Sequence, residues 1–377
     1  MKILHVCRQY RPCLGGVERF VSDLAARLAA RGHTVHVATL NRCWRGERLP
    51  DRETVNGIPV HRLPFVGGPL FFFAPGVLPL VADFDLVHVH NTDFFLDALA
   101  LTRWAHRRPL VASTHGGFFH TADHAGLKRL YFALLTRRSL RAADVVIPNS
   151  AGDERRFAAH ARRAVRIDNA IDYPAFAAAP RRPVPGRLIT VGRLAPNKNP
   201  FALLDAFAAA RAAQPGLSLV VVGDGPLRPA LHARAAALGL ADSVRWAGQV
   251  ADAQLRAELS AAELFVSAAT YEGFGLALLE AMAAGLVPVV NTIEAFREVI
   301  VEGGNGFLAD YSQPASAAQT ILRALALAPD ERARLSAQAR ATASAYDWSQ
   351  AVPKFEAVYA KVRSQESGVR SRKSEVK

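Results

Sequence analysis

Short apolar runs alternate with amphipathic stretches along the first half of the chain. An apolar run at Ile3–Cys7 is followed by a loop that ends in Gly15 and Gly16, and apolar residues then recur at helical spacing from Val17 to Leu28. Further apolar runs follow at Thr34–Leu40, Leu86–His90, Leu110–Thr114 and Val145–Pro148. This alternation predicts a Rossmann-like domain, in which helices cover both faces of a mostly parallel sheet.

The pattern breaks between Asp168 and Arg187, where Pro180, Pro183 and Pro185 exclude a continuous helix or a central strand. Beyond this linker the alternation restarts, which predicts a second doubly wound sheet. We expect domains at residues 1–180 and 187–345, a C-terminal helix at 346–364 that crosses back to the first domain, and a flexible basic tail at 365–377. Because such sheets bind ligands at the carboxyl ends of their strands, two facing domains would enclose the active site in one cleft.

Residues 63–82 carry no charged side chain, and Phe71–Phe73 lie there among several glycines and prolines. The prolines exclude a membrane-spanning helix. The segment is either an apolar loop that touches lipid or a lipid-linked acceptor, or core packing around a strand and a turn. The sequence leaves both interpretations open.

Charge is spread unevenly over the 377 residues, whose net charge is +13. Residues 128–187 hold 13 Lys and Arg against five Asp and Glu, which suits nucleic acid, an anionic membrane surface or a diphosphate-bearing substrate. A solvated, arginine-rich helix face would have the same composition. Among the partners we expect an anionic membrane surface and no nucleic acid, and we expect the basic tail to fray and to help hold the protein there.

Neither a signal peptide nor a membrane span is indicated, because no stretch of 18 apolar residues avoids helix breakers. We therefore expect a cytoplasmic protein. Cys7, Cys13 and Cys43 are odd in number and lack the spacing of a zinc site. This favours reduced thiols over a disulfide scaffold.

Two carboxylates, Glu272 and Glu280, flank a glycine-containing loop and the expected start of a helix after Phe274 and Gly275. A helix N-terminus offers unpaired N–H groups and the positive end of a dipole, which suit a phosphate group. Glu272 would then reach sugar hydroxyls and Glu280 a ribose. The simpler alternative is a helix that starts at glycine with two solvated carboxylates.

Two cations, Arg193 and Lys198, follow the expected strand that ends at Gly192. The planar guanidinium and the compact ammonium would together neutralise a leaving diphosphate without a metal. Taken alone, both could equally be loop cations in solvent. Their expected position at the same sheet edge as the Glu272 loop favours the functional interpretation.

Histidines end two expected strands of the first half. His115 precedes two glycines at a strand end, where a neutral imidazole would bond a sugar hydroxyl or serve only structure. His88 and His90 alternate along one strand and so share a face, but the sequence places no third ligand for a metal. The turn at 223–225, Gly-Asp-Gly, is typical of nucleotide-binding folds and is weak evidence alone.

The chain carries the motifs GGVE at 15–18, PNS at 148–150, NAID at 169–172, VGRL with Lys198, GDGP, and Glu272 with Glu280. The order of these motifs resembles that of the retaining glycosyltransferases of family 4, which have the GT-B fold. The resemblance spans nearly the whole chain. It implies an N-terminal acceptor-binding domain and a C-terminal domain that binds a nucleotide sugar, with no cofactor and no metal. It also implies the donor-site residues Gly16, His115, Arg193, Lys198, Glu272, Gly273, Phe274, Gly275, Leu276 and Glu280, with His115, Arg193, Lys198 and Glu272 as the catalytic set.

The stretches VHVHNTDFFLDALALT, STHGGFFHT and YDW are similar to the α-mannosyltransferases of xanthan- and acetan-type exopolysaccharide assembly. This resemblance implies α-1,3 transfer of mannose from GDP-mannose to cellobiose on a polyprenyl diphosphate, at the inner face of the cytoplasmic membrane. It suggests an acceptor side formed by His88, His90, Asp93, Phe94 and His120. The chain departs from the family at 293–298, which puts the base and sugar pocket in question, and at Ala170 and Asn199, where glycine is common.

For the mechanism we expect an oxocarbenium-like state, with the leaving diphosphate stabilised by Arg193, Lys198 and the helix N-terminus. The acceptor hydroxyl would attack from the same face. One alternative is a UDP- or GDP-sugar transferase acting on another lipid-linked glycan or a lipopolysaccharide core. A remote alternative is a non-catalytic protein that binds nucleotide sugars or anionic polymers.

Overall fold

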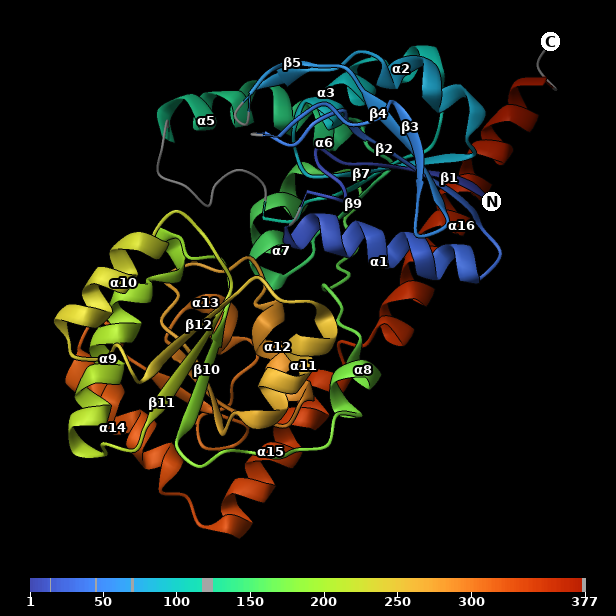
Figure 1. Cartoon of the computed structure of the whole chain (residues 1–377). Coiled ribbons are helices and arrows are strands. Elements are labelled where there is room, and N and C mark those ends of the chain that lie inside the picture. Colours follow the sequence, from blue (N-terminus) through green and yellow to red (C-terminus); the bar gives the residue numbers. More distant parts are fainter. Residues whose placement is uncertain (14, 45, 69–70, 117–124, 375–377) are drawn as a thin grey trace. The chain divides into compact units, whose positions relative to one another are not determined.

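The computed structural model describes residues 1–13, 15–44, 46–68, 71–116 and 125–374. The chain forms two compact units, which Figure 1 shows in colours that follow the sequence. Unit 1 comprises Met1–Asn169 and Ser349–Lys377, and unit 2 comprises Ala170–Trp348. The described part of the chain contains no helix that is both long and apolar enough to cross a membrane.

Unit 1 is built on a seven-stranded sheet in the order β3-β4-β2-β1-β7-β8-β9, parallel except for β3. The strands are β1 (Lys2–Val6), β2 (Thr34–Leu40), β3 (Arg52–Val55), β4 (Ile58–Leu63), β7 (Leu86–His90), β8 (Leu110–Ser113) and β9 (Val145–Ile147). The helices are α1 (Gly16–Ala30), α2 (Val77–Leu80), α3 (Phe94–Leu101), α4 (Arg103–His106), α5 (Ala125–Tyr131), α6 (Arg137–Ala142), α7 (Ala151–Phe157) and α16 (Trp348–Ser374).

The two faces of this sheet differ in chemistry because side chains alternate along each strand. Leu4 and Val6 of β1 point into an apolar core with α3 and α6. His5 points to the opposite face, where it lies level with His88 of the neighbouring strand. On that face Phe20 of α1 contacts Phe355 of α16, so these two helices cover the histidines.

Unit 2 is built on a parallel six-stranded sheet in the order β12-β11-β10-β13-β14-β15. The strands are β10 (Arg187–Val191), β11 (Ser218–Val222), β12 (Val244–Gly248), β13 (Leu264–Ser267), β14 (Val287–Asn291) and β15 (Phe307–Ala309). The helices are α8 (Tyr173–Ala177), α9 (Pro200–Ala213), α10 (Arg228–Ala237), α11 (Asp252–Ala261), α12 (Leu276–Ala283), α13 (Glu294–Arg297), α14 (Pro314–Leu325) and α15 (Pro329–Ser344).

Apolar cores lie on both faces of this second sheet. One packs α9, α10 and α14 against the strands, and the other packs α11, α12 and α13 against the opposite face. Figure 1 shows these two helical layers around the strands of unit 2. The inner strands β11, β13 and β14 are nearly continuous apolar runs because both of their faces are buried.

The unit boundaries differ from the sequence expectation. The chain passes into unit 2 after Asn169 and leaves it at Trp348, and α16 continues to Ser374. The expected frayed tail at 365–377 is therefore helical up to Ser374. The segment beyond 364 contains no proline, and its Gln, Glu, Arg and Lys residues are good helix formers, so the helix continues through Gly368.

A disulfide joins Cys13 and Cys43, so the expectation that these thiols are reduced is wrong, while Cys7 is a free, buried thiol. Cys13 follows β1 and Cys43 follows β2. These strands are parallel neighbours, so the loops at their carboxyl ends meet at one edge of the sheet. The cysteines are 30 residues apart in sequence, and only the pairing of the strands brings them together.

Candidate active site

The loop after β10 carries the two cations predicted to bind a diphosphate. Gly192 follows the strand with a φ of 158°, and Lys198 ends a short 3-10 turn, Pro196–Lys198. Arg193 is exposed, and among the described residues no carboxylate pairs with it. Lys198 is partly buried and forms an ion pair with Glu272, 74 residues away in the sequence. The structure thus brings two of the predicted catalytic residues together.

The Gly-Asp-Gly turn at 223–225 packs directly behind this loop. A Cβ on Gly223 would lie 2.0 Å from the carbonyl oxygen of Gly192, and one on Gly225 would lie 2.4 Å from that of Leu194. The N–H of Leu194 donates to the carbonyl of Asp224 at 3.0 Å. The turn therefore supports the backbone on either side of Arg193, and both glycines are required by close contact.

Asn197 ties the same loop to the segment that carries Glu272. Its carbonyl oxygen accepts from the N–H groups of Thr270 at 2.9 Å and Tyr271 at 3.3 Å. Its side-chain amide donates to the carbonyl of Tyr271 at 3.3 Å. Sequence reasoning missed this residue, whose only signal was its position beside Lys198. Asn199, at a family glycine position, has a φ of 47°, a left-handed conformation that asparagine tolerates better than most residues.

The start of α12 is the predicted seat for a phosphate. Gly275 precedes the helix with a φ of 93° and provides no side-chain cap. Its carbonyl accepts from the N–H groups of Leu278 and Leu279. Among the described residues, this leaves the N–H groups of Leu276 and Ala277 for a ligand. Phe296 of α13, from the segment that departs from the family, packs so closely that a Cβ on Gly275 would lie 3.1 Å from its ring. Gly273 is exposed and Phe274 is buried just before the helix.

Glu280 lies in the second turn of α12 and is 7% exposed. Among the described residues, a small cavity opens near the carboxyl end of β10 beside the two cations. It is lined by Thr190, Val191, Gly192, Arg193, Leu194, Lys198, Pro200, Leu203, Leu204, Leu219, Val221, Leu231, Trp246 and Ser267. Unit 2 therefore presents cations, carboxylates and a helix N-terminus along the carboxyl edge of its sheet, as expected of a site for an anionic ligand.

In unit 1 the two glycines at the start of α1, Gly15 and Gly16, have different surroundings. A Cβ on Gly15 would lie 2.1 Å from a carboxylate oxygen of Glu18, whereas a Cβ on Gly16 would meet no atom of the described residues within 4 Å. The end of the Glu18 side chain can move aside, so this contact alone does not require glycine at position 15. Gly16 faces open space, which is compatible with the close approach of a ligand.

His115 follows β8 with a φ of 45°. Its Nε2 lies 3.0 Å from Nδ1 of His90, and its ring packs edge-on against Phe20 with centroids 4.8 Å apart. Burial lowers the pKa of His115 to about 3, so the imidazole is neutral at physiological pH.

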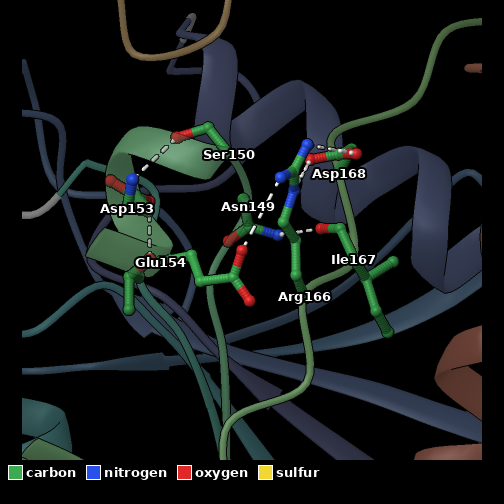
Figure 2. Close-up of polar contacts among 8 residues, drawn as sticks. Asn149, Ser150, Asp153, Glu154, Arg166, Ile167 and Asp168 are labelled. Carbon is green, nitrogen blue, oxygen red and sulfur yellow. Dashed lines mark hydrogen bonds and ion pairs between the residues drawn. The ribbon is translucent and has the colours of Figure 1, made fainter. Parts of the chain in front are cut away.

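Side chains from the start of α7 hold the His115 loop in place. Asn149 accepts from the N–H of His115 at 3.3 Å, and Asp153 accepts from the N–H of Gly116 at 2.8 Å and from the hydroxyl of Thr114 at 2.5 Å. Figure 2 shows how Asn149 and Asp153 are themselves held. The amide of Asn149 donates to Ile167, and Ser150 caps the helix by accepting from the N–H of Asp153.

His88 and His90 are fully buried, so the structure does not support their predicted place on an acceptor surface. His88 bonds Ser113 at 2.9 Å and Tyr359 at 2.7 Å through its two nitrogens. His5, which sequence reasoning missed, joins them, and ligand atoms of these three histidines lie within 4.8 Å of one another. The sequence alone did not indicate His5 as the third residue, because strand pairing and not sequence proximity brings it beside His88.

Asp93 and Phe94 have roles in packing at the start of α3. Asp93 caps the helix by accepting from the N–H of Phe95 at 3.0 Å, and it lies 3.3 Å from the guanidinium of Arg8. Phe94 stacks edge-on against Phe73, with ring centroids 5.1 Å apart. His120, the remaining acceptor-side prediction, lies outside the described residues.

Comparison with known proteins agrees with this fold and site. The family model Glycosyltransferase Family 4 matches residues 14–173, and the model Glycosyl transferases group 1 matches residues 177–342. A GDP-mannose:cellobiosyl-diphosphopolyprenol alpha-mannosyltransferase from Komagataeibacter xylinus is 36% identical, covering 96% of this chain and 93% of its own length. One from Xanthomonas oryzae pv. oryzae is 37% identical, covering 94% and 95%. Anabaena HepE, solved with UDP and glucose, matches in fold with a TM-score of 0.73 and 23% identity, covering 99% of this chain and 100% of that one.

Two α/β units, each built on a mostly parallel sheet, and full-length similarity to known glycosyltransferases define an enzyme of the GT-B class. The chain belongs to glycosyltransferase family 4. The fold class and family expected from the sequence are confirmed.

Proposed function

We propose that this glycosyltransferase moves α-mannose from GDP-mannose to a cellobiose-like glycan on a polyprenyl diphosphate, with α-1,3 linkage, in exopolysaccharide synthesis. The observation that carries the proposal is similarity at 36–37% identity over almost the whole length of relatives whose names state the donor and acceptor. Such similarity extends through unit 1, where acceptor contacts are expected, as well as through the donor half.

In this proposal unit 2 binds the donor. Arg193 has no carboxylate partner among the described residues and is available to a phosphate, while Lys198 is held by Glu272. The two cations and the N-terminus of α12 stabilise the negative charge that develops as the sugar–phosphate bond breaks. We propose that they fill this role without a metal or a cofactor. Glu280 bonds the ribose, and Glu272 bonds the sugar.

The acceptor hydroxyl attacks the same face from which the diphosphate leaves, which retains the anomeric configuration. We assign no carboxylate as a back-face nucleophile and so propose no glycosyl-enzyme intermediate. Catalysis then rests on positioning and on fixed charges rather than on covalent chemistry.

We further propose that unit 1 rests on the inner face of the cytoplasmic membrane. Of the charge-free segment, Phe72 is buried in core packing, while Phe71 and Phe73 are 43% and 54% exposed and available to a lipid surface. The ring of Phe71 lies 5.3 Å from that of Tyr131, beside the exposed Leu130. Exposed arginines on the same stretch are Arg129, Arg137, Arg138 and Arg141. Apolar and basic side chains together suit an anionic lipid surface.

The donor assignment is tested by product formation from GDP-mannose, with UDP-glucose and UDP-galactose in parallel, on polyprenyl-diphosphate-linked cellobiose. We expect mannose transfer, α-1,3 by linkage analysis, and a loss of turnover of about 100-fold or more in Lys198→Ala. Arg211→Ala, a cation on α9 away from the loop, is the matched control and should keep its turnover. Turnover from a UDP-sugar alone would reject the donor assignment.

The membrane proposal is tested by sedimentation with vesicles of neutral lipid or with added anionic lipid. We expect binding that requires anionic lipid, weakens with salt, and falls in Phe71→Ser with Phe73→Ser. Trp104→Ser removes another exposed apolar side chain, 78% exposed, from a different helix and serves as the control. Equal binding by the two variants would contradict this surface.

A specific observation favours a second candidate within the same class. Phe296 lies against Gly275 at the start of α12, in the segment where the chain departs from its family. A different pocket there would select another UDP- or GDP-sugar for a lipid-linked glycan or a lipopolysaccharide core. The same donor panel decides between the two.

A further inference from the structure

Three buried histidines and His115 form a connected cluster on one face of the unit 1 sheet. His5 pairs in register with His88, and His90 lies two residues further along the same strand, so all three side chains point to that face. Each is 0% exposed. Phe20 of α1 and Phe355 of α16 cover the cluster with their rings.

Hydrogen bonds run through this cluster in a line that ends at His115. Nε2 of His115 lies 3.0 Å from Nδ1 of His90, and Nε2 of His90 lies 2.9 Å from Nδ1 of His5. The far end, Nε2 of His5, is buried and has no hydrogen-bond partner among the described residues. His88 stays outside the line because Ser113 and Tyr359 occupy both of its nitrogens.

All three rings in the line are neutral, because burial lowers the pKa of each. A neutral imidazole carries one proton, and each of the two hydrogen bonds needs one proton between its nitrogens. Only two arrangements meet both conditions. Either His5, His90 and His115 all carry the proton on Nδ1, or all carry it on Nε2.

The two arrangements differ in what they leave buried at His5. With protons on Nε2, an N–H of His5 would be buried without an acceptor. With protons on Nδ1, only a lone pair is left without a donor. Orphaned buried N–H groups are rarer than under-satisfied acceptors in native proteins, so the Nδ1 arrangement is favoured.

We propose that His5 and His90 are positioning residues that hold His115 in its Nδ1–H form, so that His115 donates a hydrogen bond to its ligand. Nε2 of His115 is occupied by His90, and among the described residues nothing bonds its Nδ1, which leaves that nitrogen for a ligand. Asn149 and Asp153 hold the backbone around it. His115 is thus a neutral donor and not a general base. Resting on the proposed function, its partner is a hydroxyl oxygen of the bound hexose.

The direct test is a long-range ¹H–¹⁵N spectrum of the full-length enzyme labelled with ¹⁵N-histidine, with His115 assigned by loss of its signals in His115→Gln. We expect Nδ1 protonated and Nε2 unprotonated in the enzyme without substrate. The opposite pattern overturns the proposal. This result does not depend on which donor is used, so it stands apart from the proposed function.

A pair of variants tests the consequence for turnover. Asparagine places an amide N–H where His90 has Nδ1–H, whereas phenylalanine keeps the ring and removes the donor. We expect His90→Phe to lower kcat about 10- to 100-fold, with the tautomer of His115 no longer fixed, and His90→Asn to recover most of the loss. Equal loss in both, with His115 still protonated on Nδ1, would reject the role of His90.

Two further measurements cover a folding failure of the variant and the alternative of a metal site. If His90→Phe does not fold, His5→Phe and His5→Asn repeat the comparison one position further along the line. Zinc analysis of the purified enzyme checks the other use of the cluster. Stoichiometric zinc lost on substitution of His5 or His88 would show a metal site instead and overturn the proposal.

Discussion

Gly223 sets how closely two backbone segments approach behind Arg193. Its φ of 129° and the contact its Cβ would make, 2.0 Å from Gly192 O, both exclude a side chain. The carbonyl cannot retreat without moving the loop that carries Arg193 and Lys198. The position of the cations therefore depends on a residue with no chemistry of its own.

We expect Gly223→Ala to reduce turnover at least about 10-fold, because the loop must shift by a distance that matters at a reacting centre. Gly239→Ala is the matched control, since Gly239 also has a positive φ, of 68°, but its Cβ would meet no atom of the described residues within 4 Å. Both variants should lose about 1 kcal/mol of stability from the strained φ, and Gly223→Ala should lose more because its Cβ must also displace the carbonyl of Gly192. Steady-state kinetics and urea unfolding of both variants distinguish displacement of the loop from backbone strain. Equal turnover of Gly223→Ala and Gly239→Ala would contradict the interpretation.

Asp93 makes the stability of unit 1 depend on pH. Burial raises its pKa from 3.8 to about 7, against the opposing effect of Arg8. The folded state then holds a proton that the unfolded chain releases above about pH 4. Through this group, stability is fully present below about pH 4 and is lost as the pH rises to about 7.

Asp93→Asn keeps an oxygen that accepts from the N–H of Phe95 but cannot ionise. We expect the wild type to lose about 2–4 kcal/mol relative to this variant as the pH rises from 4 to 8. Urea unfolding of both proteins at several pH values measures the difference. A difference that does not change with pH would show that Asp93 is ionised throughout.

At the scale of elements, residues at the start of α7 both cap this helix and hold the loop that carries His115. Ser150 caps the helix (Figure 2). The carboxylate of Asp153, in the first turn, accepts from the N–H of Gly116 in the loop after β8. On the same helix, Glu154 faces outward and pairs with Arg166 at 3.6 Å. One helix thus carries a buried carboxylate with a positioning role and an exposed one without it.

Asp153→Ala should leave the N–H of Gly116 buried without an acceptor, at a cost of about 1–3 kcal/mol in stability, and free the loop that holds His115. We expect turnover to fall by at least about 10-fold. Glu154→Ala removes only an exposed ion pair and should change stability by less than about 1 kcal/mol, with turnover unchanged. Thermal unfolding and kinetics of both variants test this, and similar behaviour of the two would contradict it.

For the molecule as a whole, the Cys13–Cys43 disulfide ties together two loops at the carboxyl edge of the unit 1 sheet. The loop after β1 leads to the start of α1, so the bond constrains the segment before Gly16, the residue predicted to lie at the donor site. The stability that the disulfide gives unit 1 depends on redox conditions, whereas the stability from the apolar cores of unit 2 does not.

We expect Cys13→Ser to lower the stability of unit 1 by about 3–4 kcal/mol without reductant, as the closure of a loop of this length predicts. With reductant, the wild type and the variant should unfold alike. Urea unfolding under both conditions measures this, and titration of thiols in the unfolded, unreduced protein should find only Cys7. Three titratable thiols would show that the bond is absent.

Much of the fold was predictable because it follows from local patterns. Apolar runs between helical periods predicted two mostly parallel sheets, and the linker expected between Asp168 and Arg187 includes the point after Asn169 where the chain passes into unit 2. Motif order predicted the family. The carboxyl-edge rule predicted that Lys198 and Glu272 share one sheet edge, where the structure pairs them.

What the sequence alone determined are the features set by residues close together along the chain: strands, helices, caps, glycine turns and the motifs built from them. The tertiary structure alone decided which distant residues meet. It joined Cys13 to Cys43, placed His5 beside His88, and set Asp153 against the loop of His115. The physical reason is that strand order and register, which no local pattern encodes, determine these contacts.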